Sequence, residues 1–229
     1  MIRAVVFDLD GVLLDSERRW DQARREVAIG HGGHWRADAT AAMLGMSSVE
    51  WSEYMRAVLG VDLAPDQIVD LVVANLLEHY QRGLPLIPGA LEAVQRIGRR
   101  WPLALASSAG RPVIDSVLAT AGLQHDFQVT VSAEEVPRGK PAPDVYLEAA
   151  FRLGQPPRAC AAVEDSANGI RSAVAAGLRV VAVPNQDYPP PASVLAEAQV
   201  VIRSLAELTG ELVEQLDEDG PTQDQTAAH

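Results

Sequence analysis

Acidic side chains follow two short apolar runs of the sequence. Asp8 and Asp10 come after the first run, and Glu164 and Asp165 come directly after a later one. Such runs predict buried strands, and a carboxylate at the end of a buried strand is costly unless a cation meets it. Carboxylate oxygens are the ligands that hard divalent cations prefer, and Mg2+ is the usual candidate. The four residues therefore predict a metal site at the strand ends.

The chain contains a single lysine, Lys140, whereas 18 of its 19 basic residues are arginine. Because arginine and lysine are not interchangeable at a tight site, this lysine indicates a place for a compact ammonium group. Ser107 and Ser108 follow a further apolar run at residues 103–106. Ligands of an open parallel sheet bind at the carboxyl ends of its strands. We therefore expect the lysine and the serines to lie near the carboxylates at one edge of a sheet.

The elements that would position these residues alternate between strand and helix. After Pro85, apolar strand patterns are separated by helical patterns. Such alternation predicts a parallel sheet that helices cover on both faces. We therefore predict an α/β fold with a Rossmann-like core formed by residues 1–16 and 84–215. The expected strands are residues 2–7, 103–106, 127–131, 160–163, 180–183 and 200–202.

Residues 17–83 have a different pattern. They contain long helical patterns separated by loops rich in Gly, Ser and Pro, and they contain no convincing strand. The segment is predicted to be a helical insert placed directly after the first strand. Residues 216–229 are polar, acidic and rich in Gln and Thr, and we predict that this tail is disordered.

Composition excludes several classes of protein. With 48% hydrophobic and 22% charged residues, the chain is not a wholly disordered protein. Its net charge of -12 argues against nucleic acid and anionic membranes as partners, because both are bound by basic surfaces. No apolar run reaches the roughly 18 residues that span a bilayer, and no secretory signal precedes Asp8. A single cysteine, Cys160, allows no internal disulfide. We expect a cytoplasmic protein, a monomer or a homodimer.

Four stretches resemble, in order and in spacing, the four motifs of the haloacid dehalogenase superfamily. They are VVFDLDGVLLDSE, LALASSAG, GKPAPDVY and VEDSANGI. The helical insert at residues 17–83 lies where that family carries a helical cap. The resemblance implies an α/β enzyme that uses Mg2+ and acts on a small-molecule phosphate ester.

The resemblance also implies roles for individual residues. Asp8 would attack phosphorus and form an aspartyl-phosphate, and Asp10 would act as general acid and then as general base. Ser107 would bind a phosphoryl oxygen, and Lys140 would offset negative charge between Asp8 and the phosphoryl group. The implied metal ligands are Asp8, Asp10 through its backbone carbonyl, Glu164 and Asp165.

Differences from other members of the family reduce the number of reactions that this chain could catalyse. A haloacid dehalogenase lacks the second aspartate, Asp10, and a phosphonate-cleaving relative needs a cap lysine, which is absent here. A mutase similar to β-phosphoglucomutase carries a His where this chain has Trp20 and an Arg where it has Ser48. Both differences leave no evident cationic clamp for a second phosphate. We predict hydrolysis of small phosphate monoesters, with a phosphomutase or a catalytically silent regulatory or binding protein as alternatives.

The prediction of a sugar phosphate as the substrate depends on one short stretch of the sequence. The stretch DSERRWDQA resembles that of phosphatases acting on sugar or hexitol phosphates, which favours a sugar phosphate. Ser107, Ser108, Arg111, Trp20 and Glu17 are the candidate substrate-binding residues. Arg111 could contact a phosphate or lie on the surface, Trp20 could stack on a sugar or pack in the cap, and Glu17 could bind hydroxyls or be solvated.

Overall fold

The computed structural model describes residues 1–43, 46–185 and 189–216 of the chain. They form a six-stranded sheet in the order β3-β2-β1-β4-β5-β6, and these pairings are parallel. The predicted α/β fold with a parallel Rossmann-like core is therefore confirmed. The strands are β1 (Ala4–Phe7), β2 (Leu103–Ser107), β3 (Val129–Ser132), β4 (Cys160–Glu164), β5 (Arg179–Ala182) and β6 (Val200–Val201).

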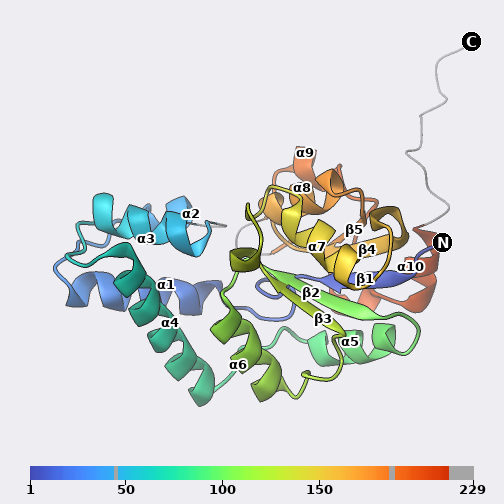
Figure 1. Cartoon of the computed structure of the whole chain (residues 1–229), viewed down its shortest axis with the longest axis horizontal. Coiled ribbons are helices and arrows are strands. Elements are labelled where there is room, and N and C mark those ends of the chain that lie inside the picture. Colours follow the sequence, from blue (N-terminus) through green and yellow to red (C-terminus); the bar gives the residue numbers. More distant parts are fainter. Residues whose placement is uncertain (44–45, 186–188, 217–229) are drawn as a thin grey trace, which may run out of the picture.

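Helical layers cover both faces of the sheet (Figure 1). Val5 and Phe7 of β1 belong to one hydrophobic cluster, and Ala4 and Val6 belong to the other. Successive side chains of a strand point to opposite faces, so a continuously apolar strand is buried on both sides. The first layer contains α5 (Ala90–Gly98) and α6 (Arg111–Ala121), and the second contains α7 (Asp144–Arg152) and α8 (Ala167–Ala175).

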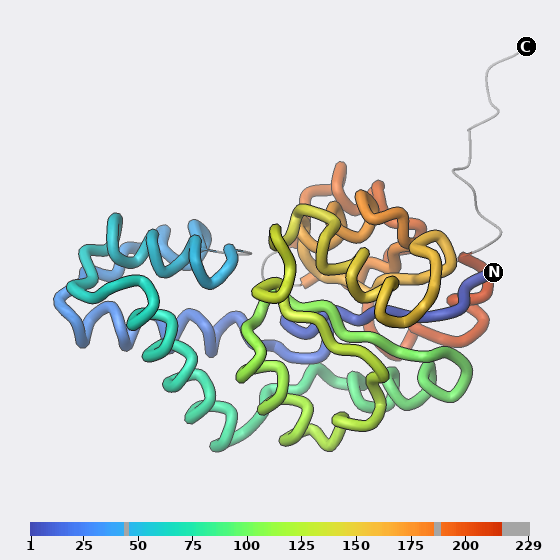
Figure 2. Tube along the Cα trace, in the orientation of Figure 1, coloured from blue at the N-terminus to red at the C-terminus, as the bar shows by residue number. Residues whose placement is uncertain are grey.

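The insert after β1 is helical, as predicted. Its helices are α1 (Glu17–Gly30), α2 (Ala39–Met43), α3 (Ser48–Ala57) and α4 (Pro65–Arg82). Ser47 and Glu50 form a capping box at the start of α3. Figure 2 shows these helices, in blue to teal, lying together beside the core. We call residues 17–83 the cap; its exact boundaries stay a prediction.

Two connections lead from the core to the cap, and they lie side by side. The backbone N–H of Asp15 donates to the carbonyl of Pro85 at 2.8 Å, and that of Ile87 donates to the carbonyl of Leu13 at 2.9 Å. The start and the end of the cap are therefore fixed next to β1, the strand that leads to Asp8.

Three α-helices in the described residues are very short. They are α2, α9 (Ala192–Leu195) and α10 (Gly210–Gln215), with 5, 4 and 6 residues. Such lengths are too short to display a helical period. The predicted disordered tail lies, apart from Leu216, outside the described residues. In the described part of the chain, none of the helices combines the length and the apolar character needed to cross a membrane.

Candidate active site

Three carboxylates meet at the carboxyl ends of β1 and β4. Asp8 follows β1, Glu164 ends β4, and Asp165 comes next. Because Phe7 pairs in register with Val163, the two strand ends are level. Asp8, Glu164 and Asp165 are all buried. The sheet therefore brings together acidic residues that are more than 150 positions apart in the sequence.

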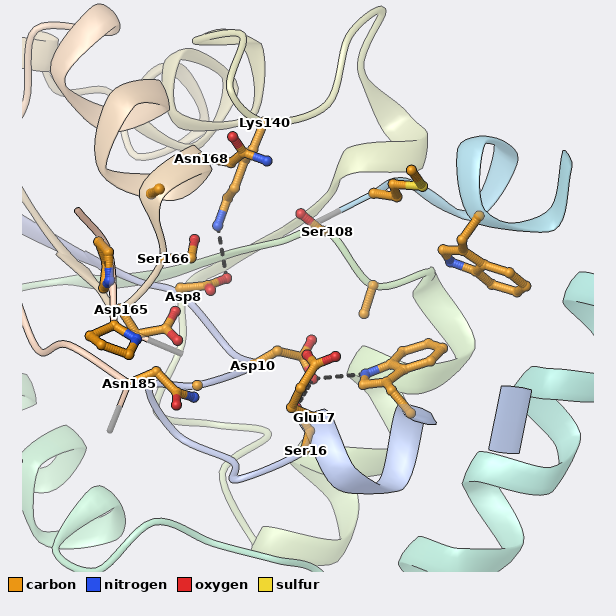
Figure 3. Close-up of a pocket in the computed structure, with 18 of the residues that line it drawn as sticks. Asp8, Asp10, Ser16, Glu17, Ser108, Lys140, Asp165, Ser166, Asn168 and Asn185 are labelled. Carbon is orange, nitrogen blue, oxygen red and sulfur yellow. Dashed lines mark hydrogen bonds and ion pairs between the residues drawn. The ribbon is translucent and has the colours of Figure 1, made fainter. Parts of the chain in front are cut away.

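The single lysine lies among these carboxylates. Nζ of Lys140 donates to Oδ1 of Asp8 at 2.8 Å, to Oε1 of Glu164 at 2.6 Å and to the carbonyl oxygen of Ala106 at 3.1 Å. Figure 3 shows the ammonium directed at Asp8. An ammonium has three N–H donors, and each has an acceptor here. The site thus uses the full hydrogen-bonding capacity of one compact cation.

Glu164 is held by protein donors on both of its oxygens. Oε1 accepts from Lys140 and from the hydroxyl of Tyr146 at 2.6 Å. Oε2 accepts from the backbone N–H groups of Asp165 and Ser166 at 3.1 and 3.3 Å. A Cβ at Gly169 would overlap this carboxylate, so the helix after β4 needs glycine there. Glu164 is therefore oriented rigidly beside Asp8.

The donor set fits a hard divalent cation. Ligand oxygens of Asp8, Glu164 and Asp165 lie within 4.8 Å of one another. Oδ1 of Asp165 is buried without a hydrogen-bond partner among the described residues. Burial, opposed by Lys140, raises the pKa of Asp8 to about 7. Burial and the neighbouring Glu164 raise the pKa of Asp165 well above its usual range. Three buried carboxylates with one ammonium leave an excess of negative charge, which an ion such as Mg2+ would offset.

The side chain of Asp10 faces the cap instead of this group. Its Oδ1 accepts hydrogen bonds from the hydroxyl of Ser16 and from Nε1 of Trp20, the latter at 3.1 Å. Figure 3 shows Asp10 beside Ser16 and Glu17, apart from Asp8 and Lys140. Trp20 is 7% exposed and packs 6.3 Å, centroid to centroid, from Trp51. Trp20 thus both packs in the cap and positions Asp10.

A cavity of about 250 Å3 separates the strand ends from the cap. This volume is below the roughly 300–1,000 Å3 typical of drug-sized ligands, which indicates a small ligand. Core and cap residues both line it. They include Asp8, Asp10, Ser108, Lys140, Asp165 and Asn168 from the core side, and Glu17, Trp20, Arg24, Ser48 and Trp51 from the cap.

Comparison with known proteins identifies the family. The sequence model of one protein family, the haloacid dehalogenase-like hydrolases, matches residues 2–177, which is more than half of the chain. The chain belongs to the haloacid dehalogenase-like hydrolases. The family resemblance and the prediction of an enzyme are thereby confirmed.

Individual relatives of this hydrolase include phosphatases. The chain is 34% identical over 225 residues to hexitol phosphatase B of Escherichia coli, covering 91% of this chain and 95% of that protein. It is 32% identical over 183 residues to the fructose-1-phosphate phosphatase of Escherichia coli, covering 78% and 95%. The crystal structure of CbbY from Rhodobacter sphaeroides in complex with phosphate has a TM-score of 0.84 and 27% identity, covering 95% of this chain and all of that one.

Two of the predicted phosphate-binding residues of the hydrolase lie outside the cavity lining. Ser107 is fully buried, and its Oγ accepts from the backbone N–H of Ala109 at 3.0 Å. Nη1 of Arg111 donates to Oγ1 of Thr130 at 2.6 Å, and its guanidinium pairs with Glu135. This placement favours the surface alternative for Arg111, because the first turn of α6 directs it toward Thr130 and Glu135. Ser108 does line the cavity.

One cation in the cavity wall is not among the residues predicted from the sequence. Arg24 lines the cavity from α1 and is 6% exposed. The cap therefore places a cationic group at the cavity, at a position other than Trp20 and Ser48, the two at which the sequence shows no cationic clamp. Glu17, Trp20 and Arg24 are spaced by three and four residues and share one face of α1. That spacing indicates a shared helix face. It does not predict a buried arginine, because charged helix residues normally face solvent.

We expect Gly11→Ala to weaken Mg2+ binding by the hydrolase. Gly11 has a φ of +80°, and a Cβ there would overlap the carboxylate of Asp165. Displacing a ligand in this way should lower metal affinity by about 10- to 100-fold, the scale of defects in the shell around metal ligands. Calorimetric titration with Mg2+ measures it.

Gly122→Ala is the matched control for this substitution. Gly122 has a φ of +72°, and a Cβ there would meet open space, so it shares the backbone strain but lies at the end of α6. Its Mg2+ affinity should equal that of the wild type. Equal affinity in the Gly11 variant would contradict the role given to this close approach.

Proposed function

We propose that this hydrolase is a Mg2+-dependent phosphatase that acts on small phosphate monoesters, with sugar or polyol phosphates as the substrate class. The observation that carries the proposal is the Asp8 carboxylate, which borders a small cavity and is held by Lys140. Relatives that act on hexitol phosphates and on fructose 1-phosphate support the substrate class. Cytoplasmic location and the choice between monomer and homodimer stay predictions.

The reaction would proceed in two displacements at phosphorus. An oxygen of Asp8 forms a bond to phosphorus while the bond to the leaving oxygen breaks, and Asp10 gives that oxygen a proton. Asp10 then takes a proton from water as the water oxygen attacks phosphorus. The bond between phosphorus and Asp8 breaks, and inorganic phosphate leaves. Each proton and each bonding pair is accounted for by Asp8, Asp10 and water.

Other residues would balance negative charge and keep the reacting groups in position during these steps. Asp8, Glu164, Asp165 and the backbone carbonyl of Asp10 would hold Mg2+, which when bound neutralises charge on phosphoryl oxygens. Lys140 would keep the Asp8 oxygen directed toward phosphorus through its 2.8 Å hydrogen bond. The indole N–H of Trp20 would keep Asp10 near the leaving oxygen, because it bonds the same carboxylate.

A phosphomutase remains the second candidate, because Arg24 gives the cap a cation that could meet a second phosphate. The carboxylate of Glu17 lies 3.9 Å from the guanidinium, however, and would repel such a group. Hydrolysis is therefore the better-supported reaction. The alternative of a catalytically silent protein has no support in a site whose Asp8, Asp10, Lys140 and Asp165 are in place.

Metal dependence tests the proposed function. Turnover of an aryl phosphate should cease in EDTA and return with Mg2+, whereas Ca2+ should support little or none. Because Ca2+ accepts about 6–8 oxygen ligands, it would let Asp8 bind through both oxygens and lose its attack geometry. The assay follows released inorganic phosphate in each metal, with circular dichroism to show that the protein stays folded. Full turnover in EDTA, or in Ca2+ alone, would refute the proposal.

A further inference from the structure

A buried guanidinium in the cap has two nitrogen atoms without a hydrogen-bond partner in the described part of the chain. Nε and Nη1 of Arg24 are buried and have none among the described residues. Its Cζ lies 5.1 Å from the ring centroid of Trp20 and 5.4 Å from that of Trp51. The two aromatic rings thus stabilise the cation, but Nε and Nη1 stay without an acceptor among the described residues. A buried charged donor without an acceptor is costly unless a ligand satisfies it.

A second unpartnered polar atom belongs to Glu17, which lines the same cavity. Oε1 of Glu17 is buried and has no hydrogen-bond partner among the described residues. It lies 3.9 Å from Nη1 of Arg24, which is an ion pair but too long for a hydrogen bond. Burial raises the pKa of Glu17 and lowers that of Arg24, each opposed by the charge of the other. Two residues that line the cap side of the cavity therefore carry an unpartnered donor and an unpartnered acceptor next to each other, as far as the described residues show.

We propose that Arg24 and Glu17 together bind a hydroxyl of the leaving group, so that the enzyme selects polyhydroxylated monophosphates over bisphosphates. This inference rests on the proposed phosphatase function. A hydroxyl accepts one hydrogen bond and donates another, so it satisfies Arg24 and Glu17 at once. A second phosphate would accept from Arg24 but place a dianion against the carboxylate of Glu17.

The position of this pair suits the far end of a substrate. The phosphoryl group would lie at Asp8, on the core side of the cavity, whereas Glu17 and Arg24 lie on the cap side. Asp10, the proposed proton donor to the leaving oxygen, lies beside Ser16 and Glu17 (Figure 3). A hydroxyl-bearing chain that extends from the leaving oxygen into the cap would therefore reach the pair. An aryl phosphate without hydroxyls would leave both groups unsatisfied.

The experiment compares kcat/KM for three substrates: sorbitol 6-phosphate, fructose 1,6-bisphosphate and p-nitrophenyl phosphate. The proteins are the wild type, Arg24→Met, Glu17→Gln and the control Arg25→Met, whose arginine is exposed on the same helix. We expect the ratio of the sorbitol ester to the aryl ester to fall by at least about 10-fold in Arg24→Met and Glu17→Gln, because a site built for a hydroxyl loses discrimination with its partners. The control should keep the wild-type ratio. Glu17→Gln should also raise the relative rate with the bisphosphate.

The outcomes separate this inference from the function on which it rests. Turnover of p-nitrophenyl phosphate with unchanged substrate ratios in both variants would overturn the inference and leave the phosphatase standing. A wild-type protein without Mg2+-dependent turnover of any ester would refute the phosphatase itself. A loss confined to the bisphosphate in Arg24→Met would show that Arg24 is a phosphate clamp and would overturn the inference. If Arg24→Met melts early, the nearly isosteric Glu17→Gln decides the result.

Discussion

Asp8→Asn is expected to abolish phosphatase turnover in a protein that remains folded. An amide oxygen is a poor nucleophile, so the first bond to phosphorus would not form. The loss should exceed about 10,000-fold, the scale seen when other enzymes lose a nucleophile. Phosphate release from an aryl phosphate measures the loss, and mass spectrometry of the variant excludes deamidation back to aspartate. Substantial turnover by the intact Asp8→Asn protein would remove Asp8 from its assigned role.

The same substitution should not lower thermal stability in EDTA. Burial, opposed by the Lys140 ammonium, raises the pKa of Asp8 to about 7, and Glu164 and Asp10 add repulsion, so the ionised carboxylate is unfavourable while no divalent cation is bound. Removing one of three clustered negative charges should leave the melting temperature equal or higher. Active sites commonly sacrifice stability for function in this way. A large fall in melting temperature would show that Asp8 has a structural role that the contacts do not indicate.

Lys140→Arg should reduce turnover by on the order of 100-fold or more, comparable to the loss of one oxyanion donor. Lys140 is 8% exposed, and its ammonium bonds Asp8, Glu164 and the carbonyl of Ala106 with its three hydrogens. A planar, bulkier guanidinium would not present its donors to the same three acceptors. The measurement is kcat at a temperature where circular dichroism shows folded protein, because overpacking should also lower stability by about 1–3 kcal/mol.

Arg138→Lys is the control for exchanging a lysine and an arginine side chain. Arg138 is exposed and pairs with Asp144 at 3.0 Å on the surface. Surface ion pairs contribute little, so turnover should not change. Near-normal turnover in Lys140→Arg would mean that any cation serves beside Asp8, and the argument from the single lysine would fail.

The residues at the strand ends are predictable because their signals are local. Asp8, Glu164 and Asp165 each follow a run whose apolar character predicts a buried strand, and parallel strands end at one edge. Lys140 is predictable for another reason, because it is the single lysine in a chain whose other basic residues are arginine. The same logic predicts the helical cap, whose periodic patterns are long.

The cap side of the site depends on packing that no local pattern encodes. Arg24 is buried because Trp20 and Trp51, on separate helices, come together around it. Arg111 illustrates an alternative that the sequence leaves open, because its nearness to Ser107 suggests a place in the site as readily as one on the surface. The start of α6 instead directs it to Thr130 and Glu135. Position 11 also depends on a distant contact. It requires glycine because a side chain there would overlap Asp165, which is far away in the sequence.

Product analysis with a hexose monophosphate tests the central claim most directly. The protein is incubated with Mg2+ and a hexose 1-phosphate, and inorganic phosphate, free hexose and hexose 6-phosphate are quantified together. The account predicts equal amounts of inorganic phosphate and free hexose, with no hexose 6-phosphate, and no reaction in EDTA. Accumulation of hexose 6-phosphate without release of inorganic phosphate would show transfer between carbons 1 and 6 and would contradict the assignment as a phosphatase.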